Sequence, residues 1–185
     1  MRSLAAVPIG VLYSLALAAP SRAVAAQDIF LAIPGLDGGS ADEQFRGAFD
    51  ALLATSGVAS DPGSGAPSGA GAGKPTFSPV VVKLRGPTAA SPSLEQAVAS
   101  GQRFPQAVVS FRRGGERRFV FLTYTLSNVA VSSFKREANA AEDAPSESVS
   151  LTYARIKTDY QGQNPDGSAG PVVSVCWDVT TNARC

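Results

Sequence analysis

Apolar residues alternate with polar ones over much of this chain, which is the pattern of β-strands. The longest such run, FVFLTYTLSNVAVSSF, covers residues 119–134. With a period of two, one face of this strand carries Val120, Leu122, Tyr124 and Leu126, and the other carries Phe119, Phe121, Thr123 and Thr125. The first face is that of a core strand, and the second is more apolar than a free surface usually is. The run therefore predicts either a central strand of a sandwich or a wall that also meets a neighbouring subunit.

Shorter apolar or alternating runs predict further strands. They cover residues 28–33, 76–84, 104–113, 147–161 and 172–179. Gly114 and Gly115 separate two of these runs and predict a hairpin turn. Residues 45–60 fit either a short helix or a strand. The pattern as a whole predicts a mainly β fold.

One segment, SPSLEQAVASGQ at residues 91–102, has the features of a short α-helix. Ser91 stands where an N-cap residue belongs, and Pro92 follows at the first helical position. Leu94 and Val98 are four residues apart on one face, and Gly101 follows the expected end of the helix. We expect one helix, packed on the side of the sheet.

The N-terminal residues 1–26 have the features of a cleavable signal peptide. Arg2 precedes the apolar run LAAVPIGVLYSLALAA, which is too short and too rich in alanine for a stable membrane span, and small residues follow. We expect cleavage after Ala25 or Ala26, which places the mature protein outside the cytoplasm, secreted or periplasmic, with no membrane segment. A retained N-terminal anchor is the alternative.

Residues 61–75, DPGSGAPSGAGAGKP, consist almost wholly of glycine, proline, serine and alanine. Such a segment cannot bury enough apolar surface to offset the entropy lost when its backbone is ordered. It predicts a flexible loop. Because the loop lies between two predicted strands, we interpret it as an insertion within one domain, residues 27–185, with a linker between two domains as the alternative.

The charge balance of the chain argues against two classes of partner, nucleic acid and anionic lipid. Without Arg2 and Arg22 the chain has 14 basic and 15 acidic residues, a formal charge of −1. This balance gives no general attraction to nucleic acid or to anionic lipid.

Cys176 and Cys185 would meet an oxidising compartment after export and could close a small C-terminal loop with a disulfide. Two free thiols are the alternative.

The sequence offers little for catalysis. It contains no histidine, which excludes histidine-based triads, imidazole bases and histidine-containing metal sites. Four carboxylates lie close together near a predicted turn but lack the spacing of calcium-loop ligands: Asp37, Asp42, Glu43 and Asp50. We therefore predict no enzymatic activity, no catalytic residues, no metal and no cofactor.

Two other groups of side chains have both a structural and a functional interpretation. The predicted hairpin is flanked by Arg112, Arg113, Arg117 and Arg118. A solvated hairpin tip explains these arginines more simply than an acidic partner does. An aromatic platform for a sugar could be formed by Trp177, Tyr124, Tyr153 and Tyr160. Aromatic residues in strands are more often part of the core.

The order of several segments resembles the Hcp family, the ring-forming inner-tube proteins of bacterial type VI secretion. The resemblance rests on DIFLAIPGLDGGS near the start, on the helical SPSLEQAVASGQ, and on the long strand FLTYTLSNVAVSSF. It continues through ESVSLTYARIKTDYQGQNPDGSAG and CWDVTTN. Together these segments span nearly all of the chain after residue 26. None of them is a catalytic signature.

The resemblance implies a small β-barrel with one short α-helix on its side, assembled into a homo-hexameric ring. It implies that rings stack into a tube that a contractile sheath expels, with a spike or small effector cargo as further partners. The half-apolar second face of the long strand then predicts that Phe119, Phe121 or Thr123 lies at the contact between subunits. The alternative is an exported Hcp-like barrel that acts as a binding or adhesive module without a contractile machine.

Overall fold

The computed structural model describes residues 27–60, 74–114, 118–140 and 144–185. The expected signal peptide and most of the expected flexible loop lie outside these residues. The described elements, in chain order, are β1 (Gln27–Ala32), β2 (Phe49–Thr55), β3 (Val58–Ser60), β4 (Pro75–Phe77), β5 (Val80–Leu84), α1 (Ser91–Ser100), β6 (Arg103–Arg113), β7 (Phe119–Glu137), β8 (Ser146–Thr152), β9 (Arg155–Gln163), β10 (Ala169–Asp178) and β11 (Ala183–Arg184). The prediction of a mainly β fold with one short helix is confirmed.

Six of the strands close into a barrel. Their order is β7-β6-β1-β2-β5-β8, and β8 pairs back onto β7. Closure leaves the barrel without a free edge of its own. Its interior is filled by side chains that are fully buried, among them Leu31, Phe49, Leu84, Val109, Leu126 and Leu151.

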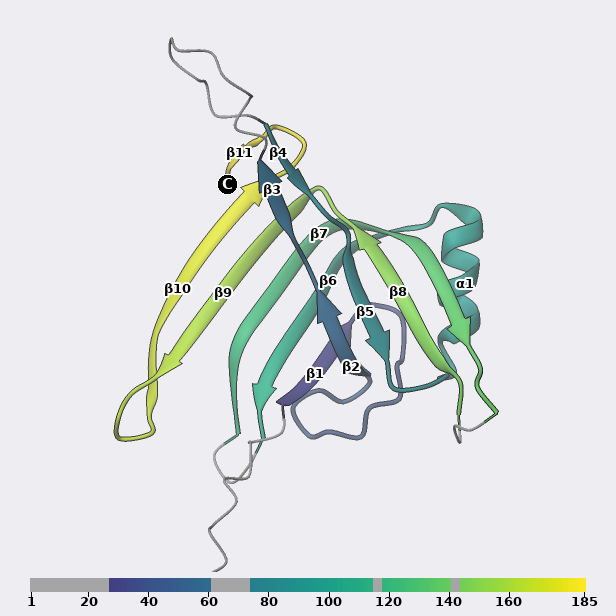
Figure 1. Cartoon of the computed structure of the whole chain (residues 1–185), viewed down its shortest axis with the longest axis horizontal. Helices are drawn as coiled ribbons and strands as arrows, with labels where there is room; N and C mark the ends of the chain where they lie inside the picture. The colour runs from purple at the N-terminus through teal and green to yellow at the C-terminus, as the bar shows by residue number, and fades with distance from the viewer. Residues whose placement is uncertain (1–26, 61–73, 115–117, 141–143) are drawn as a thin grey trace, which may run out of the picture.

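Helix α1 lies on one side of the barrel, next to β7 and β8 (Figure 1). Its residues Leu94 and Ala97 are buried and belong to the core, and Gly101 ends the helix in the left-handed conformation, with a φ of 67°. Ser91 is the first residue of the helix and not its N-cap as expected. Its hydroxyl instead donates to Oε2 of Glu147 at 2.6 Å, because this carboxylate is buried and needs donors.

Strand β7 changes partner halfway along its length. Residues 122–127 pair with β9, whereas residues 130–137 pair with β8. Between the two halves Asn128 has a φ of 53°, a conformation that asparagine tolerates better than most residues. Arg103 fixes this point, since its guanidinium donates to Oδ1 of Asn128 at 2.7 Å and to its carbonyl oxygen at 2.8 Å.

The first half of β7 therefore extends the sheet beyond the barrel. We call residues 122–127 of β7, together with β9 and β10, the wing. In Figure 1 the wing reaches away from α1, with β10 as its outermost long strand. The short β11 pairs only with the end of β10, where Trp177 faces Arg184 and Asp178 faces Ala183.

The structure decides between the alternatives that the sequence left open for residues 45–60 and for the two cysteines. Residues 49–55 and 58–60 form β2 and β3, so the helical interpretation of this segment is wrong. Cys176 and Cys185 are joined by a disulfide, which ties the end of the chain to β10. Within the described residues, no helix is long and apolar enough to cross a membrane.

Candidate interaction surface

One row of side chains runs from the barrel onto the wing. Residues that pair directly across neighbouring strands point to the same face of a sheet. Leu31 pairs with Val109, Val109 with Tyr124, Tyr124 with Thr158, and Thr158 with Val175. Leu31 and Val109 are fully buried in the barrel, so Thr158 and Val175 lie on the continuation of its interior face. We call this continuation the inner face of the wing.

Burial decreases along the inner face toward β10. The two rows beside the first one contain Leu122, Tyr160 and Val173, and Leu126, Ile156 and Trp177. Leu126 is fully buried, whereas Tyr160, Val173 and Val175 are between 48% and 62% exposed. Leu122, which the alternation assigned to the core, is only partly buried because the barrel closes beyond it.

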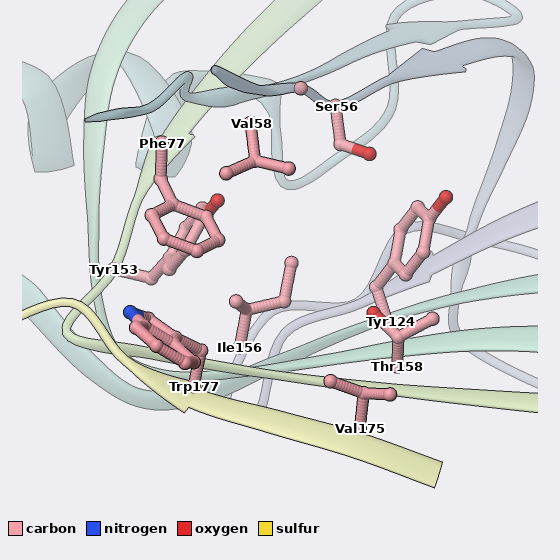
Figure 2. Close-up of a pocket in the computed structure, with 10 residues that line it drawn as sticks. Ser56, Val58, Phe77, Tyr124, Tyr153, Ile156, Thr158, Val175 and Trp177 are labelled. Atoms are coloured by element: carbon pink, nitrogen blue, oxygen red, sulfur yellow. The ribbon is translucent and has the colours of Figure 1, made fainter. Parts of the chain in front are cut away.

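The short hairpin of β3 and β4 covers part of the inner face and leaves a pocket of about 440 Å³. Figure 2 shows Val58 and Phe77 on one side of this pocket and Ile156, Thr158 and Val175 on the other. Tyr124 and Trp177 also line it, and the rings of Phe77 and Trp177 are stacked with centroids 6.4 Å apart. Every lining residue is uncharged.

Polar side-chain atoms lie at both ends of the pocket: those of Tyr153 and Trp177 at one end, and those of Ser56, Tyr124 and Thr158 at the other (Figure 2). The Tyr153 hydroxyl donates to the carbonyl oxygen of Ser78 at 3.2 Å, and burial raises the pKa of this phenol, so it stays neutral. The Trp177 indole nitrogen, drawn in blue in Figure 2, is buried without a hydrogen-bond partner among the described residues. An unpaired buried donor costs about 1–3 kcal/mol. Because no lining residue is charged, the pocket favours uncharged and largely apolar groups.

The aromatic residues considered as a sugar platform only partly come together. Tyr124, Tyr153 and Trp177 line the pocket, whereas Tyr160 lies in the next row of the wing and is exposed. No carboxylate, amide or guanidinium side chain lines this pocket. The arrangement is therefore an apolar surface with few groups that could orient a sugar.

The opposite face of the wing is polar. Thr123 pairs with Asp159, and Asp159 with Ser174. The Ser174 hydroxyl donates to the Asp159 carboxylate, and Lys157 bonds it at 2.9 Å. These two contacts hold the pKa of Asp159 below its ordinary value. The charged groups of this face are thus already partnered within the chain.

Of the three residues predicted at a subunit contact, Phe119 and Phe121 lie under one guanidinium, and Phe121 lines the same hollow as Thr123. A register shift places Leu122 opposite Phe111 and Val120 opposite Arg112, so β7 has one additional residue here and the strict alternation is broken. Phe121 consequently packs near the ring of Phe111, at 6.4 Å. The Arg113 guanidinium lies over the rings of both Phe119 and Phe121, and Thr123 lies on the polar face of the wing. A contact role for Phe119, Phe121 and Thr123 stays a prediction.

The carboxylates near the first turn serve the fold. Asp37 accepts a hydrogen bond from the Gly39 amide, and Asp50 accepts one from the Ser40 hydroxyl. Glu43 is exposed. Over the described parts of the chain, no group of three or more histidine, cysteine, aspartate or glutamate side chains is placed to hold a metal ion.

Arg112 differs most from the sequence-based interpretation. It was expected at a solvated hairpin tip, but it is almost fully buried because β6 continues beside β1 as far as Arg113. Its guanidinium contacts Asp28 at 2.9 Å and Asp42 at 2.6 Å, and it lies over the ring of Phe30. The hydrogen bond from Arg112 holds the pKa of Asp42 below its ordinary value.

Sequence reasoning missed the inner face of the wing. The residues VVSVCWDV were assigned to a last strand, and their alternation of Val173, Val175 and Trp177 is visible in the sequence. What the sequence does not show is that, in the part of the chain that the structure describes, no long strand lies across from them.

Comparisons with known proteins agree on one family. A family model described as "Type VI secretion system effector, Hcp" matches residues 30–160. The chain is 36% identical over 96 residues to protein hcp1 of Pseudomonas aeruginosa, and the alignment covers 51% of this chain and 59% of that protein. The matched segment thus spans less than two thirds of this relative's length.

Solved structures share the fold over most of both chains. The structure of a type six secretion system protein has a TM-score of 0.81 at 26% identity, covering 86% of this chain and 100% of that one. Hcp1 from Salmonella typhimurium has a TM-score of 0.68 at 24% identity, covering 86% and 99%. Because the family model matches well over half of its residues, this chain belongs to the Hcp family of type VI secretion proteins.

Proposed function

We propose that this protein is a non-enzymatic structural protein that assembles with itself into hexameric rings, which stack into a tube for type VI secretion. Its membership of the Hcp family supports this role. The observation that carries the proposal is the inner face of the wing. This face continues the apolar barrel core yet leaves Tyr160, Val173 and Val175 about half exposed or more. Contiguous exposed apolar surface of this kind marks an interaction site.

A structural role also accounts for the charged groups. Arg112 is held by Asp28 and Asp42, and Glu147 by Arg136 and Ser91. These side chains join β1, β6, β7, β8 and α1. Asp28, Asp42 and Arg112 also line a polar pocket of about 360 Å³ with Asp50, but each of its three carboxylates accepts a hydrogen bond from Arg112 or Ser40 and is not a free base. We therefore propose no catalytic residue and no cofactor.

The expected partners follow from the same assembly. A ring would enclose a lumen that could hold a small effector protein, and the end of a stack would meet a secretion spike. A net charge near zero argues against nucleic acid as a partner.

We further propose that residues 1–26 are removed and that the protein is exported. Strand β1 begins at Gln27, so cleavage after Ala26 would leave the whole of β1 in place. The bond between Cys176 and Cys185 suits an oxidising compartment. N-terminal sequencing of exported protein should give Ala26 or Gln27 as the first residue. An intact Met1 chain as the sole exported form would contradict this expectation.

The oligomeric state tests the main proposal. Native mass spectrometry of the full chain, after any processing by the cell that produces it, should give the mass of six copies. Negative-stain electron microscopy should show rings and, at high protein concentration, short stacks. A protein that stays monomeric up to millimolar concentration would contradict the ring. That outcome would favour the exported binding module.

A further inference from the structure

The large apolar side chains that are exposed in the described residues fall into two groups on different parts of the molecule. One group lies on or beside the wing and its pocket, namely Val58, Tyr160, Val172, Val173 and Val175. The other is the pair Leu52 and Leu53 in β2, which belongs to the barrel wall.

The pair in β2 reverses the usual placement of large and small residues. Leu52 and Leu53 are 49% and 53% exposed, while Ala51 is buried and Ala54 packs against the core. A register shift between Ala51 and Leu53, opposite β5, allows two consecutive leucines to be exposed. Burying leucine is worth more than burying alanine, so the barrel alone does not explain this choice.

The inner face of the wing has the opposite property, because it is an apolar surface with an unfilled pocket. The pocket has no charged lining residue, and its volume of about 440 Å³ exceeds what one aliphatic side chain needs. Val173 and Val175 extend this surface toward the edge of β10. Within one chain, then, exposed leucines and an apolar pocket that would accept them lie on separate elements.

We propose that Leu52 and Leu53 of each copy pack against the inner face of the wing of the next copy. This inference rests on the proposed ring. A contact between two different patches of identical chains is heterologous, and repeating it around an axis closes a ring in which every subunit gives one patch and receives the other. Both groups of exposed apolar side chains are then buried by one contact.

Charged substitutions on each side of the contact test this arrangement. In the leucine variant, Leu52→Asp and Leu53→Asp are combined, and in the wing variant Val173→Asp and Val175→Asp are combined. Each should raise the protein concentration needed for assembly by about 100-fold or more, because a carboxylate in a dry contact is strongly unfavourable. All four side chains are exposed in the single chain, so both variants should keep the circular dichroism spectrum of the wild type.

Val172→Asp is the matched control. Val172 lies in the same strand and is 53% exposed, but it pairs with Gln161 on the opposite face. Under this inference the variant should assemble like the wild type, whereas a subunit contact through Phe121 and Thr123, which line the same hollow as Val172, would make it fail to assemble.

Mixing the two assembly-deficient variants gives the sharpest result. The leucine variant keeps an intact wing, and the wing variant keeps intact leucines. An equimolar mixture should therefore form 1:1 heterodimers with a single intact contact, visible by native mass spectrometry, while each variant alone stays monomeric. No heterodimer, or a ring formed by either variant alone at the wild-type concentration, would overturn the inference.

Cross-linking in the otherwise unchanged protein covers the case in which a variant fails to fold. Leu53→benzoylphenylalanine should give covalent dimers on illumination, with the attached peptide from β9 or β10. Attachment to another part of the chain, or no dimer from assembled rings, would reject the inference. A wild-type protein that is itself monomeric would instead reject the ring on which the inference rests.

Discussion

The two halves of β7 have the same alternation of apolar and polar residues but end in different surroundings. In the second half, Val129 and Val131 are buried, because β8 closes the barrel around them. In the first half, Leu122 and Tyr124 lie on the inner face, yet their two rows end at the exposed side chains of Val173 and Val175 in β10. The comparison teaches that the pattern fixes which face is apolar, whereas closure of the sheet decides whether that face is covered.

The largest expected difference between the halves is in packing. Leu126→Ala should lower the free energy of unfolding by about 2–5 kcal/mol, because Leu126 is fully buried where barrel and wing meet. Val175→Ala, at the end of the wing, should change it by no more than about 0.5 kcal/mol. Urea unfolding of the monomer measures both. Equal losses would mean that the wing is as well packed as the barrel.

A second difference concerns ion pairs. Glu147 in the barrel is fully buried and pairs with Arg136 at 2.8 Å. Arg136→Met should cost about 3 kcal/mol, because it leaves a buried carboxylate with the Ser91 hydroxyl as its remaining side-chain donor. Arg155→Met in the wing should cost much less, since Arg155 is exposed and Asp178 keeps its bonds to Thr180 and Thr181. A larger loss for Arg155→Met would reverse the comparison.

The disulfide should contribute less than the barrel ion pair. Its loop is short, with a sequence separation of 9, for which the chain-entropy model gives at most about 2.5 kcal/mol. We expect a lower melting temperature in the combined variant Cys176→Ser and Cys185→Ser, with an unchanged barrel. A reducing agent should destabilise the wild type and leave this variant unaffected. Equal melting temperatures of wild type and variant would show that the bond does not stabilise the fold.

The smallest expected effect is a pH dependence at the end of the wing. Hydrogen bonds from Thr180, and then from Arg155, hold the pKa of Asp178 well below its ordinary value of 3.8. Because the pKa is lowered in the folded state, the stabilisation is present above pH 3.8 and is lost as the pH falls below it. The melting temperature of wild type should therefore exceed that of Asp178→Asn at pH 7, and the two should converge in acid. A constant difference from pH 7 to pH 2 would contradict this assignment.

Much of the fold could be predicted from local features of the chain. The strands, the helix ending at Gly101 and the shared face of Leu122, Tyr124 and Leu126 depend on periodicity and on the conformational freedom of glycine, which act over a few residues. The burial of Arg112 could not be predicted this way. It depends on Asp28 and Asp42, which lie 84 and 70 residues away in the sequence.

The alternation in the sequence by itself determined a mainly β fold with one helix and more apolar strand surface than a core needs, and the barrel was implied by the resemblance to the Hcp family. The tertiary structure decided which part of this apolar strand surface is left exposed. Asn128 divides β7 between two partners, and a register shift exposes Leu52 and Leu53. Alternation is a property of each strand, but coverage depends on which strands lie opposite one another, and that is set by pairings between residues far apart in the chain.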